Sequence, residues 1–267
     1  MISDFLFFTA QPMTPPAAGS FFHVVLAVSG SLMAASVSCF LARSSRLRPE
    51  RILFFSGFIL IILECYKQAF LYTVVNGGRY DWWYFPFQLC STPMYICLLY
   101  PFLSAHAPRQ TAIQKALATY LETFGLLGGI MALAFPEGFL TGYLSLTLHG
   151  FLWHFLLIFI GVYCAKKGLS DFSEHGFSRA LPFYVLFCLI ASVINTAVQL
   201  KVYPESYADM FYINCFFPSE QPIFDRISLL LGNFWGHLAY MFTSCIGAWL
   251  IHFIWKKCAR RREAQPI

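Results

Sequence analysis

Apolar runs long enough to cross a lipid bilayer recur along this chain and constrain its fold more than any other feature. A hydrocarbon core of about 30 Å needs about 20 consecutive apolar residues in a helix. Hydrophobic residues make up 58% of the 267 residues and charged residues only 12%, whereas a soluble domain carries about 25% charged residues. We therefore expect an all-α, polytopic membrane bundle of about seven transmembrane helices, a multi-pass protein of the cell membrane. The seven predicted spans are 21–43, 51–74, 82–104, 113–135, 143–165, 180–200 and 232–255.

The predicted spans form a single membrane domain, with short flanking segments. Residues 21–255 make up this transmembrane domain, 1–20 an extracellular N-terminal segment and 256–267 a basic cytoplasmic tail. The longest connection, 201–231, is rich in aromatic residues and proline, and we expect it to cover the outer surface as a lid. The start of the chain has no basic region before its short apolar run, so no cleavable signal peptide is expected.

Lysine and arginine alternate between abundant and scarce in successive loops, and this alternation predicts the orientation. Loops that face the cytoplasm carry the excess of these residues. The predicted orientation is therefore N-terminus outside and C-terminus inside, and topology accounts for the net charge of +5 without a nucleic-acid partner. The basic residues of the first, third and fifth loops are Arg43, Arg46, Arg48, Arg51, Arg109, Lys115, Lys166, Lys167 and Arg179, and the C-terminus reads WKKCARRREAQPI.

Polar and ionisable residues inside the spans are costly in a bilayer and mark function by default. A helix rises about 1.5 Å per residue, and depths counted on this basis put residues of several spans in the outer half of the membrane. We expect these residues to line one cavity that opens outward. They are Glu64, Lys67, Gln88, Cys90, His154 and Asn195, with His237 near the outer interface. Glu122 is nearer the inner side and fits this cavity less well.

The same residues also have plain structural interpretations. Glu64 and Lys67 are spaced i, i+3, so they can pair on one helix face. A histidine in a span is more often a hydrogen-bonded packing residue than a catalyst, and Cys90 is more often a small buried hydrophobe. His149 and His154 are about 140° apart on a helix, so one can face the cavity and the other a neighbouring span. They lack the i, i+4 spacing of a helical metal site, and no metal or other cofactor is expected.

The third predicted span contains FPFQLCSTPMY, residues 85–95, in which an amide and a thiol lie among apolar residues. Pro86 falls in the first turn of the span, where its missing N–H costs little. Pro93 is expected in the helix interior, where it would kink the span and free the carbonyl of Leu89, beside Cys90. The sequence therefore predicts a cavity wall at this level.

Three segments together resemble the YwaF family of bacterial integral membrane proteins. FPFQLCSTPMY resembles the Pro-x-[His/Gln]-Leu-Cys signature of that family, and AFPEGFLTGYLSLTLHGFLWHFLLIFIGVY resembles its histidine-containing span. DMFYINCFFPSEQPIFD followed by GNFWGHLAYMF resembles its closing region. YwaF proteins are in turn similar to the eukaryotic transmembrane protein 164 family, regarded as acyltransferases that use a cysteine and a histidine on membrane phospholipids.

The resemblance implies that His154 is the catalytic histidine, because it follows a Phe-Pro pair at a comparable distance and has Tyr163 nine residues on. In the eukaryotic family the cysteine directly follows a proline and a histidine comes next. Here Phe87 and Gln88 occupy those positions, and Cys90 lies about one helical turn further on.

Given this resemblance, an acyl-transfer site would use His154 to activate the thiol of Cys90. Gln88 and Asn195 could donate hydrogen bonds to the oxyanion, and Glu64 could orient the imidazole.

Three functions are compatible with these features. The first is a lipid acyltransferase or hydrolase whose partners are phospholipids or lysophospholipids. The second is a transporter that uses Glu64, Lys67 and His154 as a relay, although no inverted repeat is visible. The third is a non-catalytic membrane protein that binds a lipid or another ligand in the same cavity. Nothing in the sequence indicates an oligomeric state.

Overall fold

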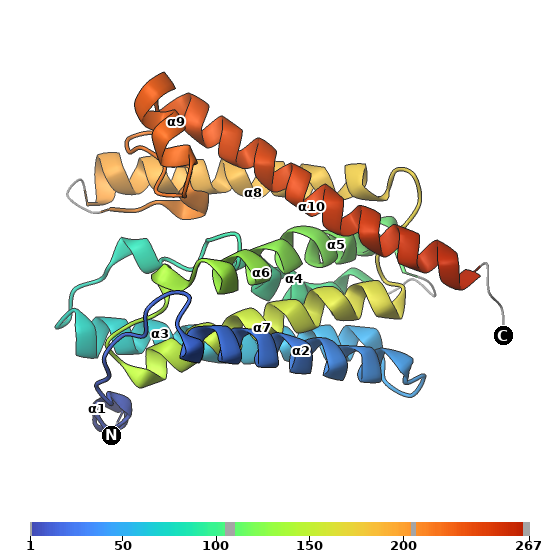
Figure 1. Ribbon diagram of the computed structural model, residues 1–267, viewed down its shortest axis with the longest axis horizontal. Coiled ribbons are helices and arrows are strands. Elements are labelled where there is room, and N and C mark those ends of the chain that lie inside the picture. The colour runs from blue at the N-terminus through green and yellow to red at the C-terminus, as the bar shows by residue number, and fades with distance from the viewer. Residues whose placement is uncertain (1, 105–109, 204–206, 264–267) are drawn as a thin grey trace.

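The computed structural model describes residues 2–104, 110–203 and 207–263. Arg109 of the third loop, residues 204–206 of the predicted lid and residues 264–267 of the basic tail lie outside the described residues. Throughout the described part, the regular elements are helices. They form an elongated bundle with the N- and C-termini at opposite ends (Figure 1).

Within the described residues, six helices are long and apolar enough to cross a membrane, and each corresponds to one of the predicted spans. Two are uninterrupted α-helices, α2 (Phe21–Arg43) and α7 (Leu144–Lys167), and α10 (Asn233–Glu263) contains a third. The other three include a π-helical turn, in which the chain is locally wider than an α-helix. They are α3 (Pro49–Phe70) with Leu71–Val75, α5 (Ala112–Tyr120) joined to α6 (Leu126–Ala134) through Leu121–Gly125, and α8 (Gly176–Ala197) with Val198–Val202.

The predicted third span, 82–104, is not a continuous helix, so that part of the prediction is wrong. It consists of a 3-10 turn at Trp82–Tyr84, a non-helical stretch, α4 (Thr92–Leu99) and a second 3-10 segment, Tyr100–Ser104. Pro86 and Pro93 are the physical reason, because a proline disfavours the helical conformation in the residue before it. Pro93 lies in the first turn of α4 and does not kink a helix interior. The depth assigned to Cys90 at 1.5 Å per residue therefore does not hold.

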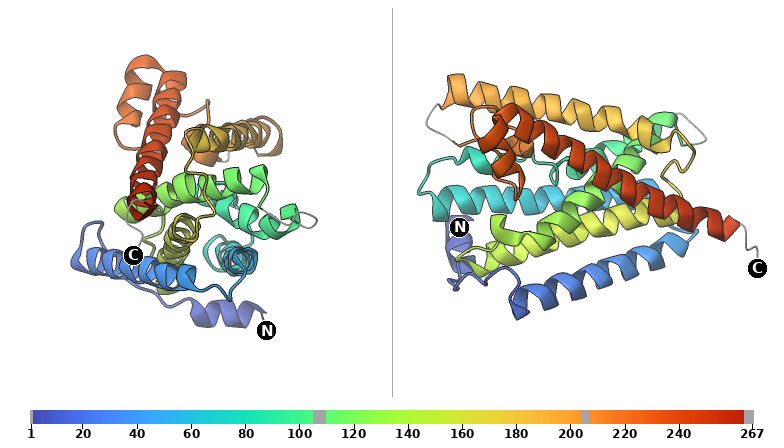
Figure 2. Two further views of the ribbon diagram at one scale, coloured as in Figure 1. Left: turned by 90° about the vertical axis from the view of Figure 1, so that its right-hand side faces the viewer. Right: turned by 45° about the horizontal axis from the view of Figure 1, so that its top comes forward.

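The middle of the bundle is made by α7 and the α5–α6 helix, most of whose side chains are buried. Most side chains in the spans α2, α3, α8 and α10 are not buried, and these helices surround the central pair (Figure 2). Apolar side chains on the outer helices, such as Phe40, Leu189 and Phe242, remain exposed, as expected for surfaces that face lipid.

The two ends of the bundle differ in chemistry. The C-terminus lies at one end with the loop 44–48, the start of α5 and the loop 168–175 (Figure 1), and we call it the basic end. The opposite end, which we call the lid end, carries α1 (Ile2–Thr9), the loop 76–81 and α9 (Phe224–Leu231). The basic loops thus gather as the alternating charge pattern predicts.

Candidate functional site

The break in the third apolar segment exposes backbone carbonyls that helical hydrogen bonds do not satisfy, and side chains bond them instead. An unbonded carbonyl inside a membrane bundle would cost several kcal/mol. The Leu89 carbonyl, expected from the sequence to be free for a ligand, is bonded as well. The bonds run from Gln68 Nε2 to Tyr84 O (2.6 Å), from Tyr95 Oη to Pro86 O (2.6 Å), from Trp153 Nε1 to Cys90 O (3.1 Å) and from Thr92 Oγ1 to Leu89 O (2.9 Å).

Cys90 packs against α6 at a pair of glycines. A β-carbon at position 128 would lie 3.7 Å from Cα of Cys90, and one at position 129 would lie 3.3 Å from the carbonyl oxygen of His154. Because glycine has no side chain, backbones can approach closely at such positions. The pair Gly128–Gly129 therefore brings the Cys90 segment and the middle of α7 to the same stretch of α6.

Glu64 and Lys67 form the ion pair that their spacing on α3 predicts. Lys67 Nζ lies 2.9 Å from Glu64 Oε2, and Gln68 Nε2 donates a 2.7 Å hydrogen bond to Glu64 Oε1. The ammonium group also lies 5.8 Å from the centre of the Trp153 ring, within the range of a cation–π contact. Gln68 also bonds Tyr84 O, and the Nε1 of Trp153 bonds Cys90 O, so the pair and the broken segment belong to one polar region inside the bundle.

His149 and His154 face different neighbours, as their angular separation predicts. His149 stacks on Trp153, with ring centres 5.9 Å apart, and lies on the side of α7 that faces α3. His154 lies against Phe139, with ring centres 5.1 Å apart. Its side chain is 7% exposed, and no hydrogen bond among the described residues joins it to Cys90.

Hydrogen bonds to carbonyl groups determine which nitrogen of each ring carries the proton. Nε2 of His149 lies 3.0 Å from the oxygen of Leu63, and Nδ1 of His154 lies 2.7 Å from the oxygen of Gly150. A carbonyl oxygen can only accept, so the nitrogen facing it must donate. Nδ1 of His149 and Nε2 of His154 are then the unprotonated acceptors in the neutral rings, and either could serve as a base.

Gln88 and Asn195 hold a loop of the lid end in place. Gln88 Nε2 donates to Asp209 O (2.9 Å), and Phe211 N donates to Gln88 Oε1 (2.7 Å). Asn195 Nδ2 donates to Met210 O (3.0 Å), and Met210 N donates to Asn195 Oδ1 (2.7 Å). Both amide side chains are thus engaged with backbone, which differs from the oxyanion-donor role expected from the sequence.

The loop held by these amides is buried, and we call residues 208–214 the plug. Ala208, Asp209 and Met210 are each 0% exposed, so the predicted lid inserts its central part into the bundle. Phe211 and Tyr212 adopt left-handed backbone conformations, with φ of 60° and 56°, which cost about 1–2 kcal/mol per residue with a side chain. Strain of this kind persists where the surroundings enforce it, often at functional sites.

Asp209 places a carboxyl group inside the plug. Its Oδ1 accepts a hydrogen bond from Asn214 N (2.8 Å), while Oδ2 is buried without a hydrogen bond. Burial raises the pKa of Asp209 to about 7, and the negative charge of Glu220 acts in the same direction.

His237 lies on α10 one turn before Tyr240, whose ring contacts Tyr212 of the plug at 6.3 Å. Its side chain is 6% exposed, and its Nε2 is buried without a hydrogen bond. It thus lies on the helix that contacts the plug, and among the described residues no hydrogen bond joins it to Cys90 or His154. Among the described residues, no group of three or more His, Cys, Asp or Glu side chains could hold a metal ion.

A second buried polar pair was not expected from the sequence. His252 Nδ1 on α10 lies 3.0 Å from Glu122 Oε2, and these side chains are 5% and 0% exposed. Glu122 lies in the π-helical turn Leu121–Gly125, and such turns often occur at functional sites. The residues are 130 positions apart, so the pattern within a single span carried no signal of the pairing.

Comparison with protein families assigns the chain to one family. Residues 18–254, nearly its whole length, match the model of the TMEM164 family. The chain belongs to the TMEM164 family. No curated protein and no solved structure matches it. The family match covers α2 to α8, the plug and most of α10, and so includes the broken segment, both histidines of α7 and the Glu64–Lys67 pair.

Proposed function

We propose that this membrane protein moves fatty acyl chains of phospholipids, either to a lysophospholipid or to water. The observation that carries the proposal is the placement of Cys90 on non-helical backbone against Gly128, next to Gly129, which packs on the backbone carbonyl of His154. Non-helical backbone at membrane depth occurs where it is buried in protein or lines a cavity. A thiol with a base within reach is the pair of groups that covalent catalysis needs, and the family resemblance supports lipid chemistry.

In the proposed reaction, Sγ of Cys90 attacks the ester carbonyl carbon of a phospholipid, and the thiol proton passes to Nε2 of His154, directly or through a water. The oxygen of the tetrahedral intermediate gains negative charge, which the ammonium group of Lys67 stabilises. The ester C–O bond then breaks, the proton moves from His154 to the departing lysophospholipid oxygen, and a thioester remains on Cys90. A lysophospholipid hydroxyl or water resolves the thioester by the reverse proton path.

An acyl-exchange assay tests this proposal. Purified protein is mixed with phospholipids and lysophospholipids, one acyl chain carries an isotopic label, and mass spectrometry follows its transfer. His154→Gln should slow transfer at least about a hundredfold, since a positioned base contributes about 10²- to 10⁴-fold. Cys90→Ser should slow it similarly because a hydroxyl is a far weaker nucleophile at neutral pH. Cys65→Ser, which alters an exposed thiol on α3, is the matched control and should leave the rate unchanged.

The variants also separate the alternatives. Loss of transfer in His154→Gln alone would mean that the histidine activates water and that Cys90 is a packing residue. If His149→Gln abolishes acyl transfer and His154→Gln retains it, the base is His149, on the other face of α7. If the wild-type protein transfers and releases no acyl chain, the enzyme proposal fails, and a non-catalytic lipid-binding protein or a transporter takes its place.

The orientation that accompanies this function is N-terminus outside and C-terminus inside. It is supported by the basic residues gathered at the end of the bundle that holds the C-terminus, because basic loops stay in the cytoplasm. A reporter enzyme active only in the cytoplasm, fused after Ile267, should be active. A reporter active only outside the cytoplasm, fused at the same point, should be inactive, and the reverse pair of results would contradict the orientation.

A further inference from the structure

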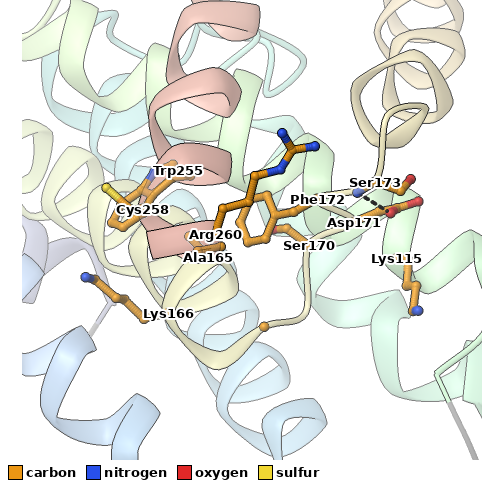
Figure 3. Close-up of a pocket in the computed structure, with 12 residues that line it drawn as sticks. Lys115, Ala165, Lys166, Ser170, Asp171, Phe172, Ser173, Trp255, Cys258 and Arg260 are labelled. Atoms are coloured by element: carbon orange, nitrogen blue, oxygen red, sulfur yellow. Dashed lines mark hydrogen bonds between the residues drawn. The ribbon is translucent and has the colours of Figure 1, made fainter. Parts of the chain in front are cut away.

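A cleft of about 570 Å³ opens at the basic end of the bundle. Its walls are the first turns of α5, the end of α7, the loop 168–173 and the last turns of α10 (Figure 3). Three basic side chains line it, Lys115, Lys166 and Arg260, one from each of the three helices.

Among the described residues, Asp171 is the one acidic residue that lines the cleft, and its charge is already neutralised. Arg179 Nη1 lies 2.7 Å from Asp171 Oδ2, and Ser173 N donates to Oδ1 at 3.0 Å. Burial by itself raises the pKa of Asp171, but the hydrogen bonds from Ser173 and Arg179 outweigh it and lower the pKa overall. The carboxylate therefore stays paired with Arg179, and the lining keeps an excess of positive charge.

The cleft is held in a fixed shape by its own hydrogen bonds. Ser170 Oγ donates to Ala118 O (3.3 Å), and Asp171 N donates to Thr119 Oγ1 (2.9 Å), which ties the loop to α5. Lys256 Nζ donates to Ser173 O (3.0 Å), which ties the same loop to α10. Ligand sites are usually largely pre-formed clefts with a few placed polar groups, and this cleft meets that description.

The surroundings of the cleft match the boundary between lipid and water. Trp255 lines the cleft and receives a cation–π contact from Lys166, whose Nζ lies 5.0 Å from the ring centre. Tryptophan is enriched at the level of lipid headgroups. Along α10 from Trp255 towards the membrane, Ile254, Phe253 and Leu250 are exposed apolar side chains. A lipid packed against the outside of α10 would therefore have its headgroup at the level of the cleft.

From these observations we propose that the basic cleft binds the phosphate group of an anionic membrane lipid, with Lys166 and Arg260 as its principal contacts. Clusters of basic residues next to membrane spans recognise anionic headgroups, and arginine binds phosphate oxygens with a planar pair of donors. In Figure 3, the side chains of Lys166, Arg260 and Lys115 lie around the cleft, and their charged ends point in different directions. The α10 wall, from Trp255 to Arg260, lies beyond residues 18–254, which match the family model.

The proposal can be tested with the full chain in neutral detergent. Native mass spectrometry measures the lipid retained as phosphatidylglycerol or phosphatidylcholine is titrated. Phosphatidylglycerol should bind at least tenfold more tightly than phosphatidylcholine, and the double variant K166Q/R260Q should lose at least tenfold in apparent affinity. The charge-retaining variant K166R/R260K should stay within about threefold of the wild type.

The matched control is R46Q/R48Q, which removes two basic residues from another loop at the same end of the bundle. It should bind like the wild type, and thermal melting should show that all variants are folded. Equal loss in the control and the cleft variant would overturn the proposal, as would a wild type without preference for the anionic lipid. A second experiment adds inorganic phosphate as a competitor of the bound lipid. If phosphate displaces the lipid at concentrations similar to those of the lipid itself, the site binds free phosphate and the lipid assignment is wrong.

Discussion

Replacing Glu122 by alanine should lower the free energy of unfolding by about 1–3 kcal/mol, the cost of leaving a buried hydrogen-bonding group without its partner. The carboxylate is fully buried and His252 Nδ1 lies 3.0 Å from it, so alanine leaves the imidazole facing an apolar cavity. The pair joins the central α5–α6 helix to α10, so its loss should loosen the contact between them. Thermal unfolding in detergent, followed by tryptophan fluorescence, measures the change.

Three further variants show whether the pair itself is responsible. Glu122→Gln keeps an acceptor for a neutral imidazole and should cost much less than Glu122→Ala. Glu137→Ala removes an exposed glutamate and should change stability by less than about 0.5 kcal/mol. The double variant Glu122→Ala/His252→Ala should cost less than the sum of the single variants. Additive effects would show that the two side chains do not interact.

Replacing Asn195 by alanine should open the plug. The substitution removes two hydrogen bonds and leaves Met210 N and Met210 O unpaired in a buried site, at about 1–3 kcal/mol for each group. The left-handed residues Phe211 and Tyr212 relax when the plug leaves, so opening relieves strain that the closed state holds. Amide hydrogen exchange should then be at least tenfold faster across residues 208–214, with little change in α7.

The control for this prediction is Ser192→Ala, one turn earlier on α8. Ser192 Oγ bonds the carbonyl of Cys188 in its own helix and makes no bond to the plug. It should leave the exchange of residues 208–214 as in the wild type. If Asn195→Ala also leaves exchange unchanged, then packing of the aromatic side chains holds the plug closed, and the amide bonds are secondary.

The sequence predicted the parts of this structure that depend on local pattern. Six spans follow from apolar length alone, and the Glu64–Lys67 pair follows from its i, i+3 spacing. The prediction of a helix over the third span was wrong because it relied on apolar length alone, whereas Pro86 and Pro93 prevent a continuous helix there.

The contact partners of several site residues differ from the prediction, and these are the residues at which segments distant in sequence meet. Asn195 and Gln88 were assigned to a cavity from their depth, yet their partners are the backbone of the plug, 121 residues from Gln88. The partner of Glu122 is 130 residues away, on α10. Depth along a span and periodicity within it carry no information about which residue of another helix lies opposite. Such contacts arise from packing of the whole bundle.

The broken third segment has a consequence for the order in which the chain enters the membrane. A newly synthesised span normally enters lipid as a helix in which all backbone hydrogen bonds are made within the span. Here the carbonyl of Cys90 is bonded by Trp153 of α7, a residue synthesised about sixty positions later. Until α7 arrives, lipid would face an unbonded carbonyl at this point. Residues 82–104 would therefore wait beside α3, shielded from lipid by the insertion machinery, and enter the bilayer together with the later helices.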